Sequence, residues 1–197
     1  QRARWRDLDT RIITSGVGDP IPEADLYFWG GGQDQEQVRV AYDLQGAKGD
    51  TLKRAVRNGA ALLAICGGYQ LLGHEYRPHD ADPLPGISLF DAVTEAGPER
   101  FIGNVIVDTN QFGPLVGFEN HSGLTRLGPT TRPLGTVRIG RGNNGHDGTE
   151  GAIEMHAIGC YLHGSLLPKN PGLADWLIGA ALAHGEDVVP LAPLDDE

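Results

Sequence analysis

The chain has 197 residues, of which 40% are hydrophobic and 21% charged, so it can bury a core of ordinary size and is not a disordered protein. Its net charge of -10 argues against nucleic-acid binding, and no apolar run reaches the ~18 residues of a membrane span. Two cysteines are too few for a disulfide framework, and the first residues lack the apolar run of a signal peptide. We therefore expect a cytoplasmic protein with a single domain over residues 1–197.

The first half of the chain predicts strands and helices in alternation. The uninterrupted apolar run at 60–65 is typical of a strand buried on both faces. The expected elements are the tail of a helix in 1–9, strands at 11–14, 25–29 and 60–65, helices at 34–44 and 50–58, and a short helix that ends at 72. This order predicts an α/β fold with a parallel sheet and helices on its faces.

The second half predicts shorter strands among turns rich in glycine and proline. We expect strands at 87–93, 101–107, 134–139 and 152–156, and a further strand-like segment at 158–162. A last helix is expected over 171–184, because Pro171 suits the first turn of a helix.

Cys66 is the strongest candidate for a catalytic residue. It lies between the buried strand and the short helix and is followed by Gly67 and Gly68. A nucleophile on such a sharp turn needs small neighbours, and the amino end of the following helix would favour the thiolate. The N–H of Gly67 would then point toward the oxyanion that forms on attack. The alternative is a buried structural cysteine, which is also our interpretation of Cys160.

A cysteine nucleophile needs a base, and His163 is the best placed of the seven histidines. It follows a strand-like segment and precedes Gly164, and the active sites of parallel sheets gather at strand ends. The alternative is a strand-end histidine with a purely structural hydrogen bond. His121 is the second candidate, although we expect it to be a hydrogen-bonded surface residue. We expect solvated side chains at His74, His79, His146 and His184.

Three consecutive glycines, Gly30 to Gly32, come between an expected strand and an expected helix. A backbone N–H here, which we assign to Gly31, could be the second donor to the oxyanion. A phosphate-binding loop is a weaker interpretation because no Gly-Lys-Ser/Thr ending follows, and a plain turn stays open. No cysteine or histidine spacing supports a metal site.

Two motifs together carry a family resemblance. Ile65–Gln70 and Tyr161–Gly164 resemble the class I glutamine amidotransferases of the CobB/CobQ-like, cobyric-acid-synthase-like branch. Three further stretches, 30–37, 117–123 and 166–170, extend the resemblance to nearly the whole chain. Within this branch, the combination is most similar to glutaminase subunits that serve lipid II amidation.

The resemblance implies a three-layer, flavodoxin-like α/β fold and a glutaminase reaction. Cys66 would attack the side-chain amide of L-glutamine and form a thioester, His163 would transfer the protons, and Arg100 would hold the substrate. No cofactor is expected in this chain. The ammonia would pass, within a heterodimer, to a MurT-like Mur ligase that uses ATP and Mg²⁺ to amidate the D-glutamate α-carboxylate of lipid II. Lipid II could bring the complex to the inner face of the membrane.

The sequence departs from the family pattern at three points. Ser165 stands where many relatives carry an acid two residues after the histidine, so we expect a carboxylate of the partner to orient His163, with Asp175 and Glu154 as weaker candidates. The usual Tyr-Gly-Asp-x-Gly-Asn stretch is absent, which suggests that a first strand is missing. The chain also has no ATP-binding motif.

Three other functions stay open at this point. The chain could be a glutaminase for corrinoid amidation, although cobyric acid synthases usually fuse this domain to an ATP-binding one. It could be another cysteine hydrolase on a similar sheet, such as a PfpI-like protease. It could also be a non-catalytic subunit that positions the ligase.

Overall fold

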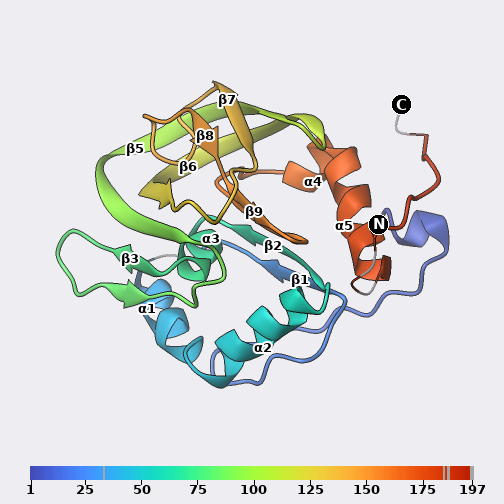
Figure 1. Cartoon of the computed structure of the whole chain (residues 1–197), viewed down its shortest axis with the longest axis horizontal. Helices are drawn as coiled ribbons and strands as arrows, with labels where there is room; N and C mark the ends of the chain where they lie inside the picture. The colour runs from blue at the N-terminus through green and yellow to red at the C-terminus, as the bar shows by residue number, and fades with distance from the viewer. Residues whose placement is uncertain (33, 184, 186, 196–197) are drawn as a thin grey trace.

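The computed structural model of the chain describes residues 1–32, 34–183, 185 and 187–195, without the side chains of residues 34 and 35 (Figure 1). Its centre is a four-stranded sheet of order β1-β2-β10-β9, built from Leu26–Trp29, Ala61–Ile65, Ala157–Cys160 and Ala152–Glu154. β1, β2 and β10 run parallel to one another, and β9 runs antiparallel to β10. The carboxyl ends of β2 and β10 therefore meet at one edge of the sheet.

Helices cover both faces of this sheet. α1 (Asp34–Asp43), α2 (Ala47–Arg57) and α3 (Gly67–Leu72) precede or follow the parallel strands, and α4 (Leu166–Lys169) and α5 (Pro171–Ala183) close the chain (Figure 1). A single 3-10 turn, η1, spans Arg4–Arg6. No helix in the described part of the chain is long and apolar enough to cross a membrane.

The apolar side chains of β2 explain why this strand is central. Leu62 and Ala64 belong to a core that includes residues of α1, α2 and α3, whereas Leu63 and Ile65 belong to a second core with α5. All five residues of β2 are buried. The continuous hydrophobic run at 60–65 therefore has the two-sided burial that it predicts.

The long strands of a second sheet lie above the first sheet in Figure 1. Its strand order is β4-β3-β5-β7-β8, from Leu84–Pro85, Glu75–Arg77, Ala92–Thr109, Gly135–Ile139 and Thr149–Glu150. The long β6, Gly113–Leu127, pairs with β5 in an antiparallel hairpin that is interrupted by an irregularity between Ala96 and Phe101.

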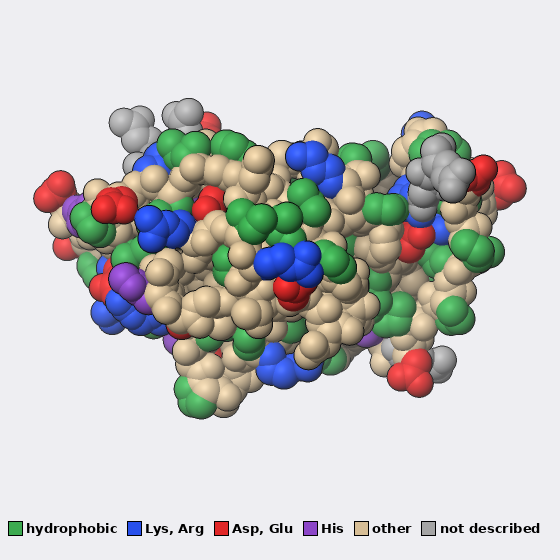
Figure 2. Space-filling view, turned by 90° about the horizontal axis from the view of Figure 1, so that it is seen from above, with side chains coloured by type: hydrophobic (Ala, Val, Ile, Leu, Met, Phe, Trp, Pro, Cys, Tyr) green, Lys and Arg blue, Asp and Glu red, His purple; other side chains and the backbone are tan. Residues whose placement is uncertain are grey.

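The hairpin has one buried and one exposed face. Val105, Val107 and Leu115 join the core on the α5 side, whereas Ile102 and Val116 are exposed. Figure 2 views the molecule from above, where hydrophobic side chains gather near the middle of the surface among charged ones.

The expected parallel sheet with flanking helices is confirmed, with β1, β2, α1, α2 and α3 close to their expected positions. The strand expected at 11–14 is absent, and the helix expected in 1–9 is only the 3-10 turn at Arg4–Arg6. The strand expected at 87–93 begins only at Ala92. α5 confirms the last helix up to Ala183, and its expected final residue, His184, lies outside the described residues.

The sequence did not predict β6. Its side chains alternate between buried and exposed, as a strand at a sheet interface requires, but the buried positions include Glu119, His121 and Thr125. Because alternation is usually recognised from apolar residues, a strand that buries polar ones gives only a weak pattern.

Candidate active site

Cys66 occupies a sharp turn between β2 and α3. Its backbone has φ 53° and ψ -113°, a conformation that costs a residue with a side chain about 1–3 kcal/mol and is found mainly where the surroundings enforce it. The Cys66 N–H donates to Cys160 O at 2.9 Å, and Cys66 O accepts from Gln70 N at 2.9 Å. These bonds tie the turn to β10 on one side and to α3 on the other, and the side chain stays partly exposed.

The three-glycine segment lies directly against this turn. A Cβ placed on Gly31 would be 3.3 Å from Cys66 Cβ and 3.8 Å from Cys66 Sγ. A Cβ on Gly67 would be 3.3 Å from the backbone nitrogen of Gly32. The missing side chains therefore allow two backbone segments to meet beside the thiol, as the placement of Gly31 and Gly67 in an oxyanion site requires.

His163 follows β10, the strand next to β2. Its main chain is fixed by a bridge to β6, because His163 N donates to Phe118 O at 2.7 Å and His163 O accepts from Phe118 N at 3.2 Å. Ile65 and Cys160 are register partners, so Cys66 and His163 both follow the carboxyl ends of neighbouring parallel strands. The fold thus brings the two predicted catalytic residues to the same edge of the sheet.

The surroundings of His163 favour its neutral form. Burial, and to a smaller extent the Arg100 guanidinium, lower the pKa of His163 below its usual value of 6.5. Its Nε2 atom is buried without a hydrogen-bond partner in the structure. A neutral imidazole with a vacant ring nitrogen can accept a proton near pH 7.

Arg100 lies on β5, close to the irregular part of the hairpin. Its Nη1 donates to Asn120 Oδ1 at 2.8 Å, and its charge affects both His163 and His121. Arg100 therefore lies near the histidine side of the site, and its guanidinium is exposed. An exposed guanidinium near the base can hold a substrate carboxylate.

His121 is not the surface residue that the sequence suggests. It lies on β6 with 2% exposure, its ring stacks on Tyr161 at a centroid distance of 3.5 Å, and its Nδ1 bonds to Gly123 O at 2.8 Å. Burial lowers the pKa of His121 from 6.5 to about 4, with smaller contributions from His163 and Arg100. The expectation failed because Tyr161, whose ring stacks on His121, follows β10 and lies forty residues later in the chain.

Buried polar residues beside the site were also missed. Gln70 and Tyr161 lie within the two motifs, and Glu150 accepts the backbone N–H of Tyr161 at 2.5 Å. Burial raises the pKa of Glu150 to about 8. The only signal in the sequence was that Gln70 and Tyr161 stand beside predicted catalytic residues.

The two carboxylates of this chain that were candidates for orienting His163 lie away from the candidate site. Asp175 on α5 binds Arg2 Nη2 at 2.5 Å and Arg6 Nη2 at 2.8 Å. Glu154 pairs with Ala157, at the end of β10 opposite to the one that leads to His163. No group of three or more His, Cys, Asp or Glu side chains that could hold a metal ion occurs among the residues that the structure describes.

Comparison with known proteins agrees with this geometry. Residues 6–171 match the family model of the CobB/CobQ-like glutamine amidotransferase domain. The subunit GatD of lipid II isoglutaminyl synthase (glutamine-hydrolyzing) from Staphylococcus aureus is 39% identical over 92% of this chain and 74% of its own length. GatD from Streptococcus pneumoniae is 38% identical over 83% of this chain, which spans 64% of that relative.

A further sequence match and two solved structures with a similar fold were also found. A cobyric acid synthase from Pelotomaculum thermopropionicum is 31% identical over 82% of this chain, but only 35% of that protein is covered. A solved glutamine amidotransferase structure matches with a TM-score of 0.58 at 17% identity, over 80% of this chain and 79% of that one. PurLQS from Thermotoga maritima matches with a TM-score of 0.59 at 14% identity, over 85% and 83%. The chain thus belongs to the CobB/CobQ-like glutamine amidotransferases and is an enzyme of that class.

Proposed function

We propose that this chain is the glutaminase subunit of a two-subunit enzyme, in which it hydrolyses L-glutamine through a thioester on Cys66 and supplies ammonia for the amidation of lipid II. One observation carries the proposal. Cys66 occupies a strained turn after β2, with Gly31 packed against it, and His163 follows the neighbouring parallel strand.

In the first half of the reaction, the Cys66 thiolate attacks the side-chain amide carbon of glutamine, and His163 takes up the thiol proton. The negative charge that develops on the amide oxygen is stabilised by the N–H groups of Gly67 and Gly31. When the C–N bond breaks, protonated His163 gives its proton to the leaving nitrogen, so ammonia departs and a glutamyl thioester remains.

In the second half, water replaces ammonia. His163, neutral again, takes a proton from the water as its oxygen attacks the thioester carbonyl. The same two N–H groups stabilise the second oxyanion, the C–S bond breaks as His163 returns its proton to the Cys66 sulfur, and glutamate leaves. Arg100 holds the α-carboxylate of glutamine throughout, as a guanidinium can do with two parallel hydrogen bonds.

The acceptor of the ammonia belongs to the partner. The relatives named lipid II isoglutaminyl synthase subunits support a MurT-like Mur ligase as that partner. It would bind ATP and Mg²⁺ and activate the D-glutamate α-carboxylate of lipid II, and ammonia from this chain would then form the amide. The two chains would form a heterodimer on the inner face of the membrane.

We further propose that a carboxylate of the partner orients His163. Ser165 occupies the position of the usual acid, and Asp175 and Glu154 are placed away from the site. A base whose ring is oriented only in the complex would make glutaminase activity depend on the partner. Substitution of each interfacial carboxylate of the partner tests this proposal. If none of these substitutions abolishes glutamine hydrolysis, the proposal is contradicted.

The test of the proposed nucleophile is intact-mass analysis after treatment with the glutamine analogue 6-diazo-5-oxo-L-norleucine. We expect one adduct on the wild-type protein that glutamine blocks and Cys66→Ala abolishes, with Cys160→Ala as the matched control that keeps it. Cys160 is fully buried and has a raised pKa, so it is inert. An adduct retained by Cys66→Ala would overturn the assignment.

The acceptor is tested separately with the co-expressed complex. We expect glutamine-dependent amidation of lipid II that Cys66→Ala abolishes and that added ammonium restores. Amidation of a corrinoid acid instead would assign the chain to the reaction of its cobyric acid synthase relatives. Unchanged glutamine-dependent amidation by Cys66→Ala would identify a subunit that only positions its partner.

A further inference from the structure

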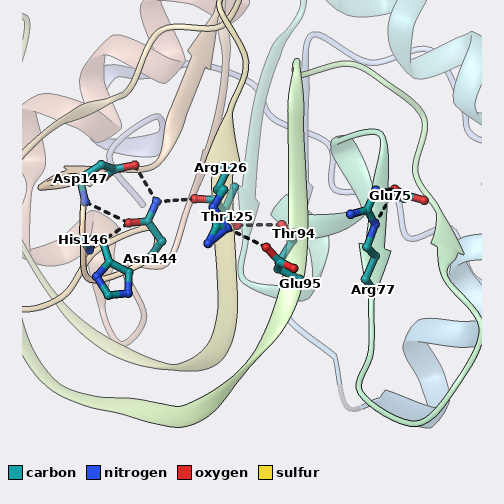
Figure 3. Close-up of polar contacts among 9 residues, drawn as sticks. All are labelled: Glu75, Arg77, Thr94, Glu95, Thr125, Arg126, Asn144, His146 and Asp147. Atoms are coloured by element: carbon teal, nitrogen blue, oxygen red, sulfur yellow. Dashed lines mark hydrogen bonds and ion pairs between the residues drawn. The ribbon is translucent and has the colours of Figure 1, made fainter.

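The hydroxyl group of Tyr161 lies in the middle of a buried chain of polar side chains. Gln37 Nε2 donates to Gln70 Oε1 at 2.7 Å, and Gln70 Nε2 donates to Tyr161 Oη at 3.2 Å. Tyr161 Oη is 2.7 Å from Thr125 Oγ1, which is 2.7 Å from Thr94 Oγ1. Figure 3 shows the threonine end of this chain, where Thr94 and Thr125 meet across paired strands.

These five residues join all the segments that make up the candidate active site. Gln37 lies on α1, which follows the three-glycine segment, and Gln70 lies on α3, which begins at Cys66. Tyr161 stands two residues before His163, and the two threonines belong to the second sheet. A shift of any one segment would therefore stretch a hydrogen bond to the next.

The ring and main chain of Tyr161 are held independently of its hydroxyl. Its N–H donates to Glu150 Oε1 at 2.5 Å, His121 stacks on one face of the ring, and Tyr69 contacts the ring edge-on with a centroid distance of 5.3 Å. Removal of the hydroxyl alone should leave the ring in place, and its effect then reports on the hydrogen bonds.

Gly123 keeps open the space in which these hydrogen bonds form. A Cβ at this position would lie 2.3 Å from Gln70 Nε2 and 2.9 Å from Tyr161 Oη. The amide of Gln70 is therefore confined between the backbone of β6 and the hydroxyl of Tyr161. If the Tyr161 hydroxyl is removed, the buried N–H of the Gln70 side chain loses its acceptor, and the packed surroundings do not provide another.

We propose that Tyr161 is a positioning residue, whose hydroxyl sets the distance between His163 and Cys66 by tying the segment that follows β10 to α3 and, through Gln37, to the three-glycine segment. This inference rests on the proposed roles of Cys66 and His163. Tyr161 itself touches no reacting atom. Proton transfer and attack depend steeply on geometry, so a displacement of about 1 Å lowers the rate of the chemical step more than it weakens substrate binding.

The test compares two buried tyrosines of the same aromatic cluster in the full protein complex. Tyr161→Phe removes the central hydroxyl, and the matched control Tyr69→Phe removes a hydroxyl that bonds Asn143 Oδ1 at 3.2 Å. For Tyr161→Phe we expect kcat for glutamine hydrolysis to fall about tenfold or more, with KM within about threefold of wild type. For Tyr69→Phe we expect kcat within about twofold.

A second pair of variants keeps the proposal testable if Tyr161→Phe folds poorly. Thr125→Val removes the next hydroxyl in the chain and should lower kcat, whereas Thr125→Ser keeps the hydroxyl and should restore it to within about twofold. A purely structural effect on packing would not follow the hydroxyl in this way.

Two results would overturn the inference: an unchanged kcat for Tyr161→Phe, or an equal loss for Tyr161→Phe and Tyr69→Phe. Failure of the proposed function gives a different result, because the wild-type protein would then show no glutamine hydrolysis that Cys66→Ala abolishes. If Cys66→Ala is inactive while Tyr161→Phe matches wild type, only the positioning role is wrong.

Discussion

At the scale of single residues, the backbone of Cys66 and the absence of a side chain at Gly31 define the candidate site. Cys66 holds a positive φ that a residue with a side chain adopts only under constraint, and a Cβ added to Gly31 would lie 3.3 Å from the Cβ of Cys66. A thiol displayed on a turn is accessible to substrate, and the adjoining glycines leave backbone N–H groups close to it. Both features are local, so each can be tested by one substitution.

We expect Gly31→Ala to reduce kcat for glutamine hydrolysis about tenfold or more. The new methyl group would lie 3.3 Å from Cys66 Cβ and 3.7 Å from Ile65 O, so the glycine segment or the thiol must move. Gly30→Ala is the matched control, because a Cβ there meets nothing within 4 Å, and we expect a much smaller effect. Steady-state glutaminase assays measure kcat for the two variants, and equal values would contradict this prediction.

His121 predicts a pH dependence of stability. Burial lowers its pKa from 6.5 to about 4, so the folded protein keeps it neutral while the unfolded chain protonates it below pH 6.5. The unfolded state therefore gains protons first as the pH falls, and the free energy of unfolding decreases between pH 6.5 and about 4. From pH 7 to pH 5 this residue should remove about 2 kcal/mol.

His121→Phe keeps an aromatic ring against Tyr161 and cannot take up a proton. Urea unfolding at pH 7 and pH 5 should show a smaller loss of stability for this variant than for wild type. The exposed His146→Gln is the control and should lose as much as wild type. The prediction is wrong if all three proteins lose the same amount.

At the scale of elements, adjacent parallel strands bring distant residues together. Cys66 and His163 are almost one hundred residues apart, but β2 and β10 are neighbours, and each residue follows the carboxyl end of its strand. The β5–β6 hairpin then brings Arg100 and His121 close enough to His163 to interact with it electrostatically. Three elements from different parts of the chain thus form the site.

The amino-terminal turn η1 is held against α5 by ion pairs at Asp175. Arg2 binds this carboxylate through two nitrogen atoms, and Arg6 binds it through one. We expect Asp175→Asn to release the turn, so that trypsin cleaves at the arginines within residues 2–11 faster than in the wild-type protein. Because these ion pairs are partly exposed, the free energy of unfolding should fall by only about 1 kcal/mol. Glu154→Gln is the control, and equal cleavage rates for the two variants would contradict the anchoring role.

At the scale of the whole molecule, the site combines firmly held and adjustable parts. The turn at Cys66 is hydrogen-bonded to β10 and α3, whereas Gly31 belongs to a segment of three glycines whose peptide groups can take either orientation. The pKa of His163 is lowered, and neither Asp175 nor Glu154 is placed to orient its ring. The chain on its own should therefore be a slow glutaminase.

We expect the proposed partner ligase to raise kcat for glutamine hydrolysis by about tenfold or more, because an oriented base and donors aimed at the oxyanion each contribute factors of this size or larger. Release of glutamate by the isolated chain and by the complex, at the same concentration of Cys66, measures the effect. Equal rates would show that the site is complete without a partner.

The sequence by itself determined the local features of this protein. The buried run at 60–65, the glycines beside Cys66 and the histidine after a strand each result from neighbours in the chain, so β2, the turn at Cys66 and the position of His163 could be predicted. Motif resemblance added Arg100 and the glutaminase family, and the family is confirmed.

Only the tertiary structure decided the rest, because it depends on contacts between distant residues. The long β6 has buried positions filled by polar side chains, and one of them, Thr125, bonds Thr94 on β5 and Tyr161, which follows β10. His121 is buried and neutral because Tyr161 stacks on it, and Tyr161 in turn is held by Gln70, Thr125 and Glu150. A polar residue is tolerated in a core only when its hydrogen bonds are satisfied, and the fold alone determines which residues satisfy them.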